Sequence, residues 1–134
     1  MKLLFIGFMI VVSVLIALPA ELKRRRLLKR FWSRSCTGRQ WRRCFPDASN
    51  EAIREFLESF ADAFAFSSEK RLKFGPDDNV MDVYRSLYPY SWQPDAMELE
   101  LLACNLEDRL GFDITRIDDF DITLGQIFEM TRKK

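Results

Sequence analysis

The residues near the start of the sequence constrain this chain most, because Leu3–Leu18 is an apolar run of sixteen residues without a charge. As a helix, at about 1.5 Å per residue, the run would extend roughly 24 Å, slightly less than the hydrocarbon core of a bilayer at roughly 30 Å. Leu22 can lengthen the run beyond Pro19 if the basic side chains that follow reach out to the headgroups. We therefore expect residues 1–22 to be a transmembrane anchor.

A cleaved signal peptide is the alternative for this segment. Ala17–Ala20 is a weak match to a small-x-small cleavage site, because Leu18 is large and Pro19 adjoins the candidate bond. The block Lys23–Arg26 (KRRR) follows directly and should resist translocation, so the positive-inside rule places the rest of the chain in the cytoplasm. The favoured prediction is a single-pass protein of a cytoplasmic (inner) membrane, as in bacteria, with a cytoplasmic C-terminal domain.

The charges divide the remainder into two parts. Residues 21–43 hold ten lysines and arginines against one acid, Glu21. Residues 44–134 hold ten basic residues against nineteen acidic ones, a net charge of −9. This asymmetry predicts a basic-aromatic juxtamembrane segment at residues 23–45 and an acidic domain at residues 46–134.

The basic segment has the composition of a helix that lies on anionic headgroups. The residues predicted to contact the membrane surface are Lys23, Arg24, Arg25, Arg26, Lys29, Arg30 and Trp32. Nucleic acid is the alternative ligand, with Trp32 and Trp41 as stacking platforms. The neighbouring apolar run favours lipid, so the bilayer is the expected partner and no nucleic acid is expected.

The acidic domain shows helical periodicity in three places. Ser49 is placed to cap a helix that runs to about Phe66, and a second helix is predicted within Pro94–Phe112, from an N-cap at Asp95 to a C-cap at Gly111. Thr123 and Gln126 have the spacing of a capping box at the start of a last helix. The apolar positions of the first two helices are Ile53, Phe56, Leu57, Phe60, Ala61 and Phe64, and Leu99, Leu102, Ala103, Leu106 and Leu110.

The second of these helices resembles helix II of the acyl carrier proteins. Asp95-Ala96-Met97 stands where that family has Asp-Ser-Leu, and the ending Leu106–Gly111 (LEDRLG) begins ten residues after Ala96, the family's register. Asp121–Gly125 (DITLG) matches the family's entry to its last helix. Over about residues 50–131 the resemblance implies an all-α, four-helix carrier-protein bundle, with a short third helix around Thr115–Phe120.

Ala96 decides what this resemblance implies for function. In the family, the serine hydroxyl at this position carries phosphopantetheine through a phosphodiester, and a methyl group cannot carry that ester. We therefore expect no prosthetic group and no other cofactor. The resemblance then implies a membrane-tethered adaptor whose acidic helix docks a protein with a basic surface of the kind that recognises carrier proteins. The partner-binding candidates are Asp95, Glu98, Glu100, Glu107 and Asp108. A carrier modified at another serine, Ser91, is the alternative.

An enzyme is the least favoured class for this sequence. The chain has no histidine, the commonest general base and metal ligand. Asp118, Asp119 and Asp121 fit a helix turn and caps better than an acid–base or metal site. The cysteines are Cys36, Cys44 and Cys104, an odd number without metal-ligand spacing, and Cys104 is expected to be buried on its helix. Acylation is the alternative for the juxtamembrane Cys36. We expect no catalytic residues and no metal.

Overall fold

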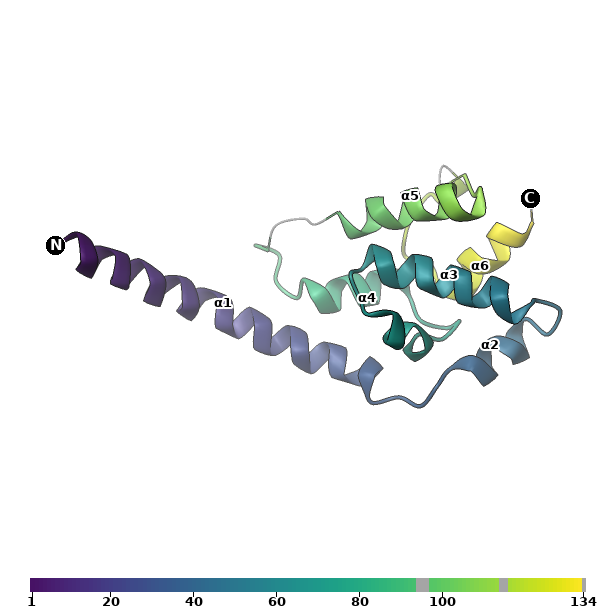
Figure 1. Ribbon diagram of the computed structural model, residues 1–134, viewed down its shortest axis with the longest axis horizontal. Coiled ribbons are helices and arrows are strands. Elements are labelled where there is room, and N and C mark those ends of the chain that lie inside the picture. Colours follow the sequence, from purple (N-terminus) through teal and green to yellow (C-terminus); the bar gives the residue numbers. More distant parts are fainter. Residues whose placement is uncertain (94–96, 114–115, 134) are drawn as a thin grey trace.

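The computed structural model describes residues 1–93, 97–113 and 116–133. Its elements are helical: α1 (Lys2–Trp32), α2 (Gly38–Cys44), α3 (Asn50–Ala63), the 3-10 helix η1 (Ser68–Lys73), α4 (Val80–Leu87), α5 (Glu98–Leu110) and α6 (Leu124–Arg132) (Figure 1). Within the described ranges, the strand-type pairing is limited to one isolated bridge between Asn79 and Thr123. The all-α prediction is therefore confirmed.

Helix α1 projects from a cluster formed by the other helices (Figure 1). The residues of its first half are not part of the hydrophobic core. Helix α1 is one continuous helix of 31 residues that includes Pro19. The large apolar side chains between Leu3 and Leu22 are exposed, except the half-buried Val12. By length and composition, α1 is sufficient to cross a membrane.

The second half of α1 and helix α2 belong to the folded core. Leu28, Phe31 and Trp41 are buried in the same hydrophobic cluster as the phenylalanines of α3. The Trp32 ring packs edge to face on Phe66 at 5.2 Å between ring centroids. Residues 23–45 are therefore not a segment separate from the domain at 46–134, because their apolar side chains face the protein core.

Hydrogen bonds fix the connection between α1 and α2 to the loop that follows η1. The Thr37 hydroxyl lies 2.8 Å from the carbonyl oxygens of both Leu72 and Phe74. The indole N–H of the fully buried Trp41 donates to the Phe74 carbonyl at 2.9 Å. These bonds satisfy polar groups that the core would otherwise leave without partners.

Helices α3 and α5 lie side by side (Figure 1). Helix α3 buries its whole predicted apolar stripe, whereas Leu99, Ala103 and Leu110 of the predicted α5 stripe are only half-buried. Every predicted stripe residue of α3 is buried, and Ser49 caps the helix by accepting a hydrogen bond from the Ala52 N–H at 3.1 Å. The predicted extension to Phe66 is wrong: α3 ends at Ala63, because Ala65 turns the chain with a φ of 55°. Helix α5 buries Leu102 and Leu106, and Gly111 ends it at a φ of 63°, as predicted.

The start of α6 is joined to the turn before α4. Thr123 and Gln126 form the predicted capping box. The Gly125 N–H donates to the Pro76 carbonyl at 2.8 Å. A Cβ atom at position 125 would lie only 2.8 Å from the same oxygen, so this approach requires glycine.

The proposed N-cap Asp95 and the aligned Ala96 lie outside the described residues, and the structure gives Met97 as the N-cap of α5. The expectation that Cys104 is buried is wrong, because its side chain is on the exposed side of the helix. The predicted third helix around Thr115–Phe120 begins at residue 115, which lies outside the described part, and residues 117–120 are not helical.

Candidate membrane and partner-binding surfaces

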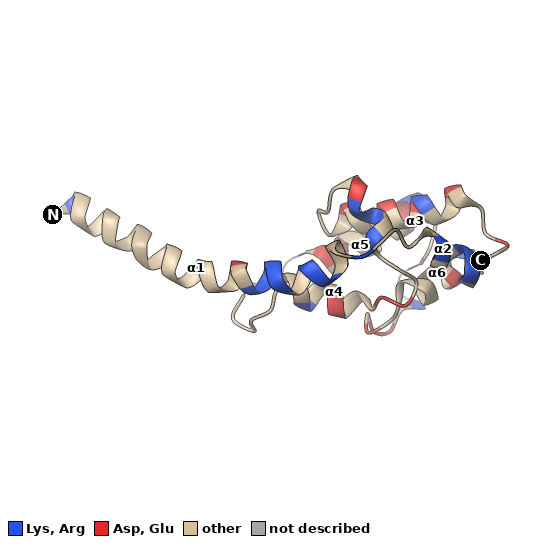
Figure 2. Ribbon diagram, turned by 90° about the horizontal axis from the view of Figure 1, so that it is seen from below, with Lys and Arg blue, Asp and Glu red and all other residues tan. Residues whose placement is uncertain are grey.

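A group of exposed lysines and arginines follows the apolar half of α1, where the ribbon is blue in Figure 2, and forms a ring around the helix. Glu21 is the acid at its edge, and Arg25 and Arg24 pair with it at 2.9 Å and 3.6 Å. An apolar stretch followed by basic residues is the pattern that membrane anchors with headgroup contacts have. We call this ring the basic collar: Lys23, Arg24, Arg25, Arg26, Lys29 and Arg30.

Trp32, which was predicted to lie on the membrane surface, is placed differently by the structure. Its ring contacts Phe66 and Phe74, and the Lys70 ammonium lies 4.2 Å from the ring centroid. The apolar side of the basic segment is thus occupied by protein, and the basic side chains alone remain available to headgroups. The helical period of Leu28, Phe31 and Trp32 fits either partner, so sequence could not decide between core and lipid.

The outward side of α5 carries a mixed acidic and apolar stripe. Glu100, Leu101, Cys104, Glu107 and Asp108 are all exposed and recur at helical spacing. Leu101 is 46% exposed and adds an apolar side chain to this acidic surface. We call these five residues the α5 outer face. Three predicted partner-binding residues, Glu100, Glu107 and Asp108, therefore lie together on one surface.

Glu98 is not presented on that surface. It is half-buried, and one of its carboxylate oxygens accepts a hydrogen bond from the Tyr88 hydroxyl. Burial raises the pKa of Tyr88, the Glu98 carboxylate raises that pKa further, and the charge of Arg24 acts in the opposite direction. Glu98 therefore joins the start of α5 to the end of α4, and its predicted role as a free docking residue is not favoured by this geometry.

The loop after α4 contains Ser91, the alternative modification site. Residues 90–93 form a local turn in which the Tyr90 N–H donates to the Gln93 side chain at 3.0 Å. The Tyr90 and Trp92 rings stack at 5.7 Å with an interplanar angle of 17°. Ser91 is exposed between them. Its loop setting lacks the helix N-terminus that would favour an attached phosphate.

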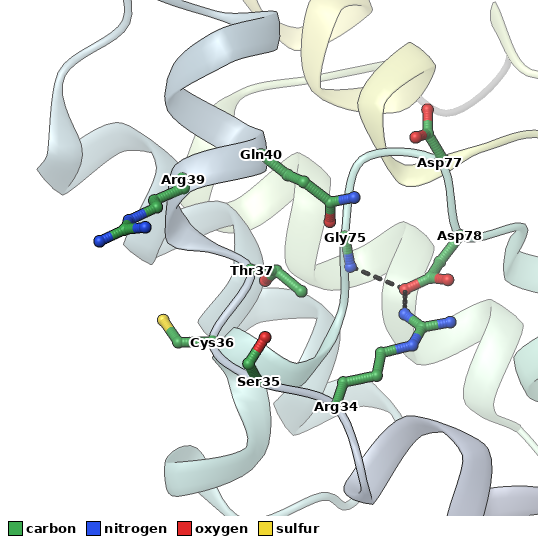
Figure 3. Close-up of a pocket in the computed structure, with 9 residues that line it drawn as sticks. All are labelled: Arg34, Ser35, Cys36, Thr37, Arg39, Gln40, Gly75, Asp77 and Asp78. Carbon is green, nitrogen blue, oxygen red and sulfur yellow. Dashed lines mark hydrogen bonds and ion pairs between the residues drawn. The ribbon is translucent and has the colours of Figure 1, made fainter.

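A shallow hollow of about 600 Å³ lies between the α1–α2 connection and the loop after η1 (Figure 3). The Arg34 guanidinium points to Asp78 at 2.6 Å, and the Gly75 N–H donates to the same carboxylate oxygen at 2.7 Å. These charged groups are partners of each other. No sequence pattern predicts this pair, because Arg34 and Asp78 are 44 residues apart along the chain. These interactions join the segment that follows α1 to the loop before α4.

The aspartates of the loop before α6 make structural contacts. Asp121 accepts a hydrogen bond from the Asn79 side chain at 2.8 Å, and Asp119 accepts one from the Asp121 N–H at 3.0 Å. The Asp119 bond is a turn interaction of the kind that the sequence predicted, whereas the Asp121 bond joins this loop to the residue before α4. Over residues 1–93, 97–113 and 116–133, the structure has no group of three or more acidic or cysteine side chains arranged to hold a metal ion.

Comparisons with protein-family models, with curated proteins and with solved structures gave no match to this chain. The likeness to acyl carrier proteins therefore rests on the residues of α5 and of the entry to α6 alone.

Proposed function

We propose that this chain is a membrane-tethered adaptor that presents the α5 outer face to a basic surface of a partner protein and carries no prosthetic group. The observation that carries the proposal is the combination of exposed Leu101 with Glu100, Glu107 and Asp108 on one side of α5. Acidic side chains of this kind steer a basic partner during encounter, whereas burial of the leucine adds affinity.

The fold part of the proposal is that α3, α5 and α6 correspond to the first, second and last helices of a carrier-protein bundle. Their order along the chain, the left-handed Gly111 and the Thr123–Gln126 capping box support the correspondence. Under this proposal, the bundle keeps a carrier protein's docking helix and has lost the hydroxyl that would carry cargo.

The topology part is that α1 spans a cytoplasmic membrane and leaves the domain in the cytoplasm. The basic collar supports this orientation, because lysines and arginines next to a span are retained on the cytoplasmic side. The α5 outer face is then available to cytoplasmic or membrane-bound partners.

Photocrosslinking of the full chain in its native membrane tests the adaptor function. A benzoylphenylalanine at position 101 should give one dominant protein adduct, whereas the same probe at Glu51, exposed on α3, should not. The triple variant Glu100→Lys, Glu107→Lys and Asp108→Lys should abolish the adduct, because it reverses the charge of the surface.

A matched variant controls for net charge alone. Glu51→Lys, Glu69→Lys and Asp118→Lys change the same number of exposed acids in other segments and should preserve the adduct. An adduct that survives the α5 triple change, or that is lost equally in the matched variant, would contradict the proposed docking surface.

A further inference from the structure

The loop at residues 88–93 lies against α1 at the level where the apolar run gives way to the basic collar. The Lys23 ammonium is 4.5 Å from the centroid of the Tyr90 ring. Ala20 is the first buried residue of α1, one turn before Lys23, although the apolar side chains on either side of it are exposed. The loop is therefore in contact with the end of the span.

This loop also extends farther along α1 towards the N-terminus than helices α3 to α6 do, in both ribbon views (Figures 1 and 2). Lys23 follows Leu18 by five residues, which is about 7.5 Å along a helix axis. If α1 spans a bilayer with the basic collar at its headgroups, the loop occupies the same headgroup layer.

The aromatic side chains of the loop suit that layer. Trp92 is 58% exposed although it stacks on Tyr90, so the fold gives this large ring no core of its own. Tryptophan and tyrosine are enriched at the membrane–water interface, where the ring contacts acyl chains and the polar edge contacts headgroups and water.

We infer that the Tyr90–Trp92 pair is a second membrane contact, a lipid-binding site of the folded domain that inserts beside α1 into the headgroup region of the same leaflet. The inference rests on the membrane anchoring in the proposed function. It adds that the domain itself is docked on the bilayer through Trp92, at a point separate from the anchor.

Quenching of tryptophan fluorescence by brominated lipid tests this inference on the full chain. The chain is reconstituted in vesicles of phosphatidylcholine and phosphatidylglycerol, with bromine either near the carbonyl end or near the methyl end of the acyl chains. The difference in emission between the unmodified chain and Trp92→Phe is the signal of Trp92 without that of Trp32 and Trp41. This part of the emission should be quenched strongly by the carbonyl-end bromine and much less by the methyl-end bromine.

A second tryptophan site provides the control. Arg43→Trp, made in the Trp92→Phe background, places an exposed indole on α2, at the end of the domain remote from the apolar half of α1 (Figure 1). The emission that it adds should be insensitive to both brominated lipids.

Flotation of the vesicles after alkaline washing separates the anchor from the second contact. Chains that float but show no Trp92-dependent quenching would overturn this inference and leave the anchor intact. Chains that do not float would overturn the anchoring in the proposed function, and the inference with it. Quenching of the Arg43→Trp signal to the same extent as Trp92 would also overturn it, because the contact would not be specific to the loop.

Discussion

Trp41→Ala tests whether the folded domain begins before residue 46. The Trp41 side chain is fully buried, and its ring lies 5.9 Å from that of Phe45, 6.0 Å from that of Phe56 and 5.7 Å from that of Phe128. Replacement of a buried tryptophan by alanine costs about 3–5 kcal/mol. Loss of the indole N–H also leaves the Phe74 carbonyl without that donor, an effect of about 1–3 kcal/mol that partly overlaps the first.

The expected destabilisation is a large part of the roughly 5–15 kcal/mol that stabilises a typical domain. Urea unfolding of the full chain in mild detergent, followed by far-UV circular dichroism, should therefore show a much lower midpoint for Trp41→Ala. The intermediate variant Trp41→Phe keeps an aromatic ring but removes the donor, and it should fall between wild type and Trp41→Ala.

Trp92→Ala is the matched control, because it removes the same side chain from a site that is 58% exposed. We expect its effect to stay within about 1 kcal/mol. If Trp41→Ala costs no more than Trp92→Ala, residues 23–45 lie outside the cooperative core and the reasoning from burial fails.

Three further predictions concern pH, cofactor and topology. Burial and the Glu98 carboxylate raise the pKa of Tyr88 in the folded state, so the unfolded chain releases the phenol proton at lower pH than the folded chain does. Stability should therefore fall as the pH rises above about 10, the ordinary pKa of tyrosine. The urea midpoint of Tyr88→Phe should fall less over the same pH range. After incubation with coenzyme A and a phosphopantetheinyl transferase, the intact mass should equal that of the bare chain, and an added phosphopantetheine removed by Ser91→Ala would favour the carrier alternative. Protease added to sealed inside-out vesicles should digest the domain, whereas digestion only from the opposite face would contradict the proposed orientation.

The local features of the fold were predictable where one short stretch determines them. Ser49, Gly111 and the Thr123–Gln126 pair cap their helices as their sequence patterns indicate, since a cap depends on residues within one turn. The apolar stripe of α3 was also correct. The end of α3 was not, because the left-handed turn at Ala65 is a conformation that alanine seldom adopts.

The features that sequence could not provide depend on contacts between distant segments. The pattern of Leu28, Phe31 and Trp32 is equally suited to lipid and to a protein core, and the choice is made by Phe66 and Phe74, more than thirty residues away. Glu98 likewise has a charged side chain of the kind expected on a solvent-exposed helix face, yet its carboxylate accepts a hydrogen bond from the Tyr88 hydroxyl. The Tyr90–Lys23 contact joins segments whose sequences give no sign of each other.

The unbroken path of α1 from Leu3 to the buried Phe31 has a mechanical consequence. A flexible linker of the length of residues 23–45 would have a root-mean-square end-to-end distance of roughly 25 Å, so a domain tethered by it could move freely relative to the span. If α1 spans a bilayer as proposed, the same helix lies in the lipid at one end and in the protein core at the other, so the domain has no such tether. Tilt or axial rotation of the span, set for instance by bilayer thickness, would therefore turn the α5 outer face through the same angle. The height and orientation of that face above the membrane then select partners by geometry as well as by charge.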